Sequence, residues 1–176
     1  MSTTTIGLLS SFTYSVTAFL QYQKVFSKLA INKTKLIVLS MIAISLHGYV
    51  LYRWIDTPVG QNLSASHLFS LVCWLIVLGT ACASLVKPVE NLSLFIFPFA
   101  ALSILLSIVY PGEHIFQTRH HPYTLFHILI SLLAFSLLGM AAMQAVLLHL
   151  QNRLLRNKAA HGIVKILPPL QTMETL

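Results

Sequence analysis

The chain has 176 residues, of which 56% are hydrophobic and only 9% are charged, and its mean hydropathy is +0.79. Soluble domains carry roughly 25% charged residues, so the composition excludes an ordinary soluble domain, a disordered chain, a coiled coil, a collagen and a disulfide-rich secreted fold. A lipid bilayer is the solvent that suits such a chain. The formal net charge of +7 must therefore be compatible with a membrane protein.

Five long tracts of the sequence contain no Asp, Glu, Lys or Arg. The tracts are 1–23, 36–52, 57–86, 91–112 and 120–152. A membrane-spanning helix needs about 20 mainly apolar residues, so the sequence predicts an all-α, polytopic transmembrane helical bundle of five spans. The spans are expected near Thr5–Lys24, Lys35–Trp54, Ser66–Val86, Asn91–Tyr110 and Thr124–Gln151. Residues 1–151 would form this transmembrane domain, and residues 152–176 a basic and apolar tail.

The basic residues lie mainly in alternate loops. Nine of the eleven follow the first, third or fifth expected span, and only Arg53 and Arg119 lie in the other loops. By the positive-inside rule, this asymmetry places the amino terminus outside and the carboxy-terminal tail in the cytoplasm. The basic residues are thus topology signals whose partner is the lipid bilayer with its acidic headgroups, and we expect no nucleic-acid partner.

The first expected span has one polar face. Ser10, Tyr14, Thr17 and Gln21 recur at helical spacing. Because polar side chains avoid lipid and bond to neighbouring helices, this face is predicted to point inward. Ordinary helix–helix bonding is the favoured interpretation, and a substrate path is the alternative.

The second, third and fourth expected spans carry more local signals. Tyr49, Tyr52 and Trp54 end the second span and are typical of an aromatic belt at the outer membrane surface. In the third span, Gly79 and Ala83 form a small-xxx-small pair that favours close helix approach.

The third span also holds both cysteines of the chain, Cys73 and Cys82. They lie about 13.5 Å apart along one helix, too far to form a disulfide with each other. In the fourth span, Pro98 removes one backbone donor, so we expect it to bend the helix.

Histidine is the residue type that could carry chemistry here, with eight in the chain. His47 is expected about 9 Å below the outer end of its span and His127 about 5 Å deep in the fifth. An ionisable residue within a span is a functional hypothesis by default, and neutral imidazole ligates iron, copper or zinc. Each ring could equally hydrogen-bond a neighbouring hydroxyl or carbonyl, and the sequence leaves both interpretations open.

The acidic residues argue against hydrolysis and ion pumping. The four are Asp56, Glu90, Glu113 and Glu174. None lies well inside an expected span, whereas a proton or ion pump needs buried carboxylates. We therefore expect no catalytic residue and no enzyme.

Four stretches of the sequence resemble a known family. They are SLHGYVLYRWI, GQNLSASHLFSLVCWLIVLGTA, TLFHILISLLAFSLLGMAAMQAVLLHLQNRLL and LPPLQTME. Together they resemble the cytochrome c assembly family of haem-handling membrane proteins, the CcsA, ResC and CcmC type, and its YpjD-like inner-membrane branch in particular. The tryptophan-rich segment of the haem-delivery members is absent, and family chains carry further spans after the last stretch, whereas this sequence ends at Leu176.

The resemblance implies a multi-pass protein of the bacterial inner membrane in cytochrome c biogenesis. It implies haem held by His127 and His47 near the outer face, and apocytochrome c or other cytochrome assembly components as partners. An alternative from another class stays open. In it, the chain is a non-catalytic helper subunit that stabilises a transport or assembly complex, with histidines whose hydrogen bonds are structural.

Overall fold

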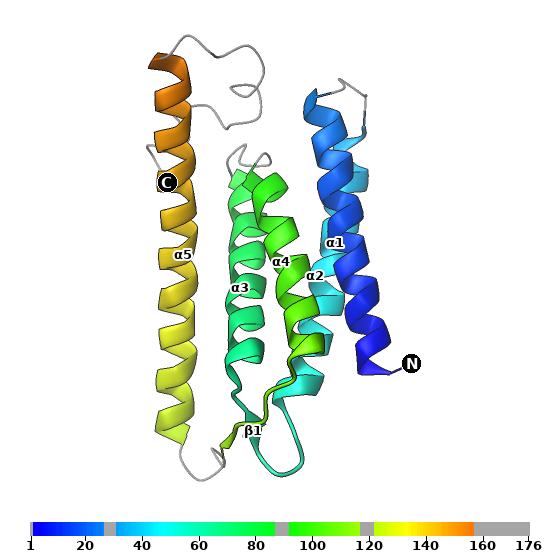
Figure 1. The fold of residues 1–176 in the computed structure, drawn as a ribbon, viewed down its shortest axis with the longest axis vertical. Coiled ribbons are helices and arrows are strands. Elements are labelled where there is room, and N and C mark those ends of the chain that lie inside the picture. Colours follow the sequence, from blue (N-terminus) through cyan, green and yellow to red (C-terminus); the bar gives the residue numbers. More distant parts are fainter. Residues whose placement is uncertain (1, 27–30, 87–91, 117–121, 157–176) are drawn as a thin grey trace.

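The structure is a bundle of helices that run alternately up and down, joined at one end by a short two-stranded ribbon (Figure 1). The computed structural model describes residues 2–26, 31–86, 92–116 and 122–156. Its helices are α1 (Thr3–Phe26), α2 (Lys33–Ile55), α3 (Ala65–Val86), α4 (Ser93–Val109) and α5 (Pro122–Arg156). The predicted tail lies outside the described residues from residue 157 onward, and α5 continues past the expected boundary at residue 151.

Each predicted span coincides with one of these helices, and every helix end lies within five residues of its predicted position. Among the described residues, three helical segments are long and apolar enough to cross a membrane: Lys33–Ile55, Ala65–Ser84 and Tyr123–His149. Helix α4 is apolar but has only 17 residues, about 25 Å of helix against a hydrocarbon core of about 30 Å. The all-α class is thus confirmed, and a crossing by all five helices stays a prediction.

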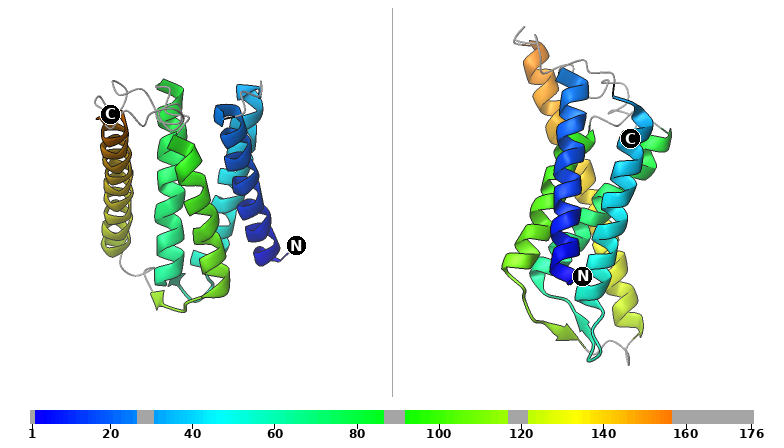
Figure 2. Two further views of the ribbon diagram at one scale, coloured as in Figure 1. Left: turned by 45° about the horizontal axis from the view of Figure 1, so that its top comes forward. Right: turned by 90° about the vertical axis from the view of Figure 1, so that its right-hand side faces the viewer.

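The helices form a packed bundle with one further helix beside it. Helix α1 packs against α2 and α4, and α3 packs against α2, α4 and α5. Helix α5 lies beyond α3, on the side away from α1 and α2, in two views of the molecule (Figures 1 and 2). Consequently α1 to α4 form the packed bundle, while α5 flanks it.

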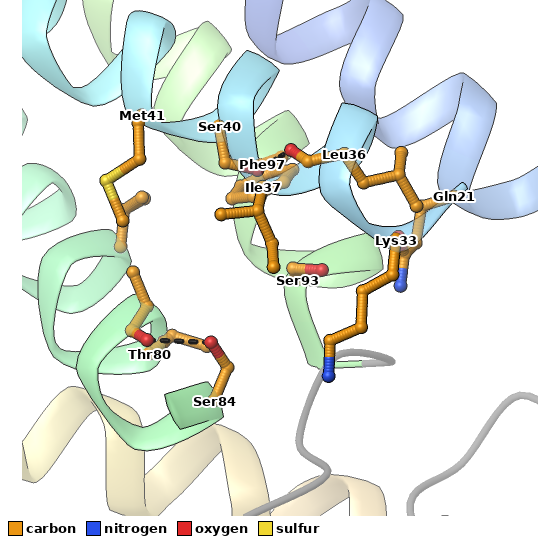
Figure 3. Close-up of a pocket in the computed structure, with 12 residues that line it drawn as sticks. Gln21, Lys33, Leu36, Ile37, Ser40, Met41, Thr80, Ser84, Ser93 and Phe97 are labelled. Atoms are coloured by element: carbon orange, nitrogen blue, oxygen red, sulfur yellow. Dashed lines mark hydrogen bonds between the residues drawn. The ribbon is translucent and has the colours of Figure 1, made fainter. Parts of the chain in front are cut away.

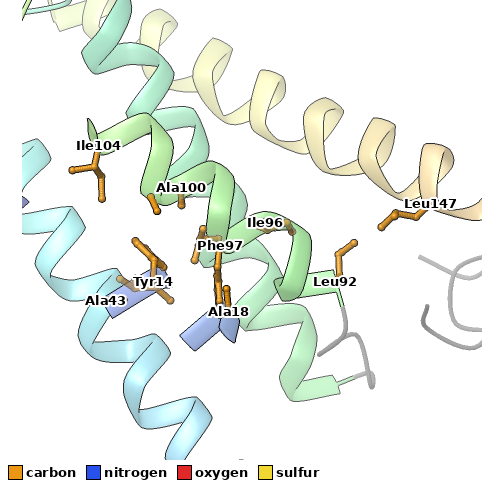
Figure 4. Close-up of a cluster of buried hydrophobic side chains, with 12 residues drawn as sticks. Tyr14, Ala18, Ala43, Leu92, Ile96, Phe97, Ala100, Ile104 and Leu147 are labelled. Carbon is orange, nitrogen blue, oxygen red and sulfur yellow. The ribbon is translucent and has the colours of Figure 1, made fainter. Parts of the chain in front are cut away.

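The core of the bundle combines large apolar side chains with several alanines (Figure 4). Ala43 of α2 and Ala100 of α4 pack beside Tyr14 of α1 in the same buried cluster. Small residues let helix backbones approach closely, which is how helices associate where lipid removes the hydrophobic driving force. Helix α5 contributes Leu147 to this cluster, next to Leu92 at the start of α4.

One end of the bundle is tied by a ribbon that sequence periodicity did not reveal. Strands β1 (Gln61–Asn62) and β2 (Ile115–Phe116) pair antiparallel. The Asn62 side chain donates to the Gly112 carbonyl at 3.0 Å and accepts from the His114 amide at 3.0 Å. Two-residue strands are too short to display an alternating pattern, so only the bonds between the two loops identify them.

Candidate functional site

The predicted polar face of α1 points into the bundle. Its four members, Ser10, Tyr14, Thr17 and Gln21, are all buried. Ser10 donates a hydrogen bond to the Ala43 carbonyl of α2 at 3.1 Å, and Thr17 donates to its own helix. The prediction that this face points inward is confirmed, and the Ser10 bond is of the helix–helix kind that the favoured interpretation requires.

His47 lies at the centre of the bundle with no exposed surface. Its Nε2 atom is 2.9 Å from the Ser70 hydroxyl of α3, and Ser70 is 3.4 Å from the Ser103 hydroxyl of α4. The edge of the imidazole meets the Tyr14 ring of α1, with 5.8 Å between ring centroids. Each of the four bundle helices therefore contributes one polar residue to a single buried cluster, which we call the His47 cluster: Tyr14, His47, Ser70 and Ser103.

Two polar atoms of the His47 cluster have no hydrogen-bond partner within the described part of the chain. They are the Tyr14 hydroxyl and His47 Nδ1. Cys73, a buried thiol on α3, lies next to the cluster in hydrogen-bond contact with Ser103. The sequence marked His47, but it gave no sign that Ser70, Ser103 and Cys73 would surround it, since they come from other helices.

His127 occupies a different place. It lies in the first turns of α5 and is exposed. Helix α5 packs against α3 on the side away from α1 and α2 (Figures 1 and 2). His47 lies on α2, where Tyr14 of α1 and Ser70 of α3 enclose it. The structure therefore does not bring the two predicted ligands together.

This geometry does not fit haem shared between His47 and His127. An axial ligand must present a nitrogen to iron beside an open face large enough for the porphyrin. His47 has no exposed surface, its Nε2 is in contact with Ser70, and Tyr14 packs against its ring. The His47 cluster is consistent with a hydrogen-bonded structural histidine, and a haem-ligand role for His127 stays a prediction of the resemblance.

A second histidine is also buried, near the ribbon. The His67 ring is stacked on Trp54, with centroids 5.4 Å apart, and its Nδ1 is 2.9 Å from the Ser64 hydroxyl. Tyr49 and Tyr52 are exposed, as an aromatic belt requires, but Trp54 is turned into this contact. The expected belt of three aromatic residues is thus reduced to two, because the indole packs on the neighbouring helix.

The outward side of α5 carries an unusual pattern. Five exposed residues lie on one side of the helix at separations of seven, seven, four and four, close to whole turns: His127, Ala134, Ala141, Ala145 and His149. We call this line of residues the α5 stripe. The face that packs on α3 is different and holds Leu132, Ser136 and Gly139. The alignment of these alanines with the two histidines was not predicted above.

No protein-family model, curated protein or solved structure matches the chain. Within the described ranges, no group of three or more His, Cys, Asp or Glu side chains is placed to hold a metal ion.

Proposed function

We propose that the chain is a non-catalytic, multi-spanning subunit of the bacterial inner membrane that assembles with another membrane protein through the α5 stripe. The resemblance to cytochrome c assembly proteins indicates the class of partner, namely other components of cytochrome assembly. All five helices would cross the bilayer, with both His127 and the amino terminus on the outer side.

The observation that carries this proposal is the exposure of small and ionisable residues on one face of a membrane-spanning segment. Ionisable residues within spans face protein or a water-filled cavity rather than lipid, because their polar atoms are costly in hydrocarbon. His127 lies about one turn inside the start of the apolar segment Tyr123–His149, His149 is the last residue of that segment, and both are exposed. Another helix packed along the α5 stripe would cover them.

The alanines of the stripe support the same interpretation. Small residues let two helix backbones approach closely, and they are enriched where transmembrane helices meet. Ala134, Ala141 and Ala145 are exposed between the two histidines, with one large apolar residue, Leu138, on the same line. Other large apolar residues lie elsewhere on the exposed surface of α5: Phe126, Leu129 and Leu133. Large apolar side chains suit contact with lipid, so α5 would have a lipid face and a protein face.

Photo-crosslinking in native membranes tests the proposal. Leu138 is exposed and lies on the stripe, four residues after Ala134 and seven before Ala145. A benzophenone amino acid at Leu138 is expected to give a cross-link to a different integral membrane protein. The same group at Leu133, which is exposed but borders the groove between α3 and α5, should react only within the chain and give no cross-link to another protein.

Two substitutions distinguish specific contact through the α5 stripe from non-specific association of α5 with other membrane proteins. Ala145→Leu would hold the partner helix away and is expected to reduce the Leu138 cross-link about tenfold, a loss of about 1.4 kcal/mol. Val146→Leu, at the adjacent exposed position, should leave it unchanged. Equal cross-linking from positions 133 and 138, or a product containing only a second copy of this chain, would contradict the proposal.

A further inference from the structure

A narrow crevice lies at the end of the bundle where α2 begins, far from the ribbon (Figure 3). Its volume is about 60 Å³, and side chains from α1, α2, α3 and α4 line it. Ile37 and Met41 of α2 lie across from Thr80 and Ser84 of α3, with Phe97 of α4 behind them. The crevice is too small to enclose a bulky cofactor, and an acyl chain could lie along it only with one side still outside.

The lining changes from polar to apolar with depth. At the helix ends it consists of Lys33, the first residue of α2, together with Ser84 near the end of α3 and Ser93 at the start of α4. About 12 Å farther along α2, at 1.5 Å per residue, it is mainly apolar, with Met41 and Val77 beside the small polar Ser40. A ligand that fits this gradient has a polar head at the membrane surface and an apolar tail directed inward.

The crevice opens sideways to the surroundings of the bundle. Ile37 and Met41, at its mouth, are 40% and 42% exposed, whereas Val77 at its back is completely buried. In a membrane, the surroundings at this depth are lipid acyl chains. An acyl chain could therefore enter between α2 and α3 without crossing water.

The charge at the end of the crevice where α2 begins indicates which class of lipid would bind. Lys33 and Lys35 both lie in the first turn of α2, and that turn contains no acidic residue. Basic pockets between transmembrane helices at the membrane surface bind anionic headgroups, and a lysine side chain reaches the headgroup level while its methylenes stay among apolar atoms.

We propose that this crevice binds an anionic phospholipid, with one acyl chain between α2 and α3 and the phosphate beside the Lys33 ammonium group. The inference requires that α2 and α3 lie in a membrane, but it is independent of the α5 stripe, which is on another side of α3. Failure of the cross-linking experiment would leave it intact.

The first test measures lipid retention. The full chain is purified in detergent, stripped of lipid, and titrated with dioleoyl phosphatidylglycerol or dioleoyl phosphatidylcholine under native mass spectrometry. One phosphatidylglycerol is expected to bind in preference to phosphatidylcholine. Lys33→Gln should weaken its binding about fivefold, while Lys35→Gln, which removes the same charge from outside the crevice, should change it less than twofold. Equal losses in the two variants would show diffuse attraction and overturn the proposal.

The second test measures occupancy of the crevice itself. In a Cys82→Ser background, an Ile37→Cys thiol at the mouth is labelled with a maleimide. Phosphatidylglycerol is expected to slow labelling at least fivefold relative to phosphatidylcholine, and an Ala81→Leu substitution that fills the crevice should remove the difference. Ala83→Leu on the same helix, outside the crevice, is the control for folding. Slowing by inorganic phosphate alone, or no slowing by phosphatidylglycerol, would overturn the proposal.

Discussion

Tyr14 and His47 each have a buried polar atom without a partner in the described part of the chain. In a soluble protein such an atom costs about 1–3 kcal/mol of folding free energy, because its hydrogen bond to water is lost and not replaced. The two rings nevertheless pack edge to face, and Tyr14 also contacts Phe97, with ring centroids 5.6 Å apart. Packing of the rings therefore holds the centre of the bundle together more than hydrogen bonding of the Tyr14 hydroxyl does.

Tyr14→Phe should accordingly leave the protein as stable as before or stabilise it by up to about 1–2 kcal/mol, since it removes an unpaired hydroxyl and keeps the ring. Ser70→Ala takes the partner from His47 Nε2 and should cost about 1 kcal/mol. Reversible denaturant unfolding in mixed micelles measures both. A loss of more than about 1 kcal/mol in Tyr14→Phe would mean that the hydroxyl has a partner, such as an internal water.

Spacing along the sequence predicts which polar residues of one helix share a buried face, but not which residues of other helices they contact. Helical spacing placed Tyr14 and Gln21 on an inward face, and both are buried. Which hydroxyls would meet His47 depends on how three helices align, and no periodicity within a single helix contains that information. Likewise, the sequence predicted that His127 lies near the start of its helix, but not that the side chain is exposed.

The contact between α2 and α3 depends on one glycine. A Cβ atom at Gly48 would lie 3.1 Å from the Trp74 ring, and the indole nitrogen donates a 2.9 Å hydrogen bond to the Ile44 carbonyl of α2. The close approach predicted at Gly79 is looser, since a Cβ atom there would meet only the Met140 sulfur at 3.8 Å. The tight position is therefore on α2, because the large partner is a tryptophan rather than another small residue.

Gly48→Val is expected to push the indole away, break its bond to Ile44 and cost about 1–3 kcal/mol of stability. Gly79→Ala is the control; it adds an ordinary contact and improves helix propensity, so it should be neutral or gain about 0.5–1 kcal/mol. Tryptophan fluorescence during denaturant unfolding measures both stability and the environment of Trp74. If Gly79→Ala destabilises more than Gly48→Val, this description of the interface is wrong.

The helices themselves were predictable because membrane-length apolar tracts separated by charges carry a strong signal. The exact ends depend on local chemistry that was not predicted: Asn32 precedes α2, and its side chain accepts a 3.0 Å hydrogen bond from the Thr34 amide. Helix α1 is the exception in composition, since four of its residues form a buried polar face that lowers its apolarity. The order of packing was not predictable, since α1 lies against both α2 and α4.

On the scale of the whole molecule, charge is separated between the two ends of the bundle. Lys24 ends α1, Lys33 and Lys35 begin α2, and Arg153 and Arg156 end α5. Because the helices alternate in direction, these residues gather at one end (Figure 1). The opposite end holds Arg53 together with the acidic Asp56 and Glu113. The fold thus brings together basic residues that are far apart in the sequence.

This separation leads to a prediction of sidedness. Basic loops are retained in the cytoplasm during membrane insertion, so the end with Lys35 should be cytoplasmic and the end with Tyr123 should be outside. In a Cys82→Ser background, Tyr123→Cys and Lys35→Cys place exposed thiols at opposite ends of the bundle. A membrane-impermeant maleimide added to intact spheroplasts should label position 123, and should label position 35 only after permeabilisation. The parent chain, whose remaining Cys73 is buried, gives the background. The reverse pattern would mean that the bundle is inverted and that His127 lies on the cytoplasmic side. A partner at the outer face could then not reach the His127 end of the α5 stripe.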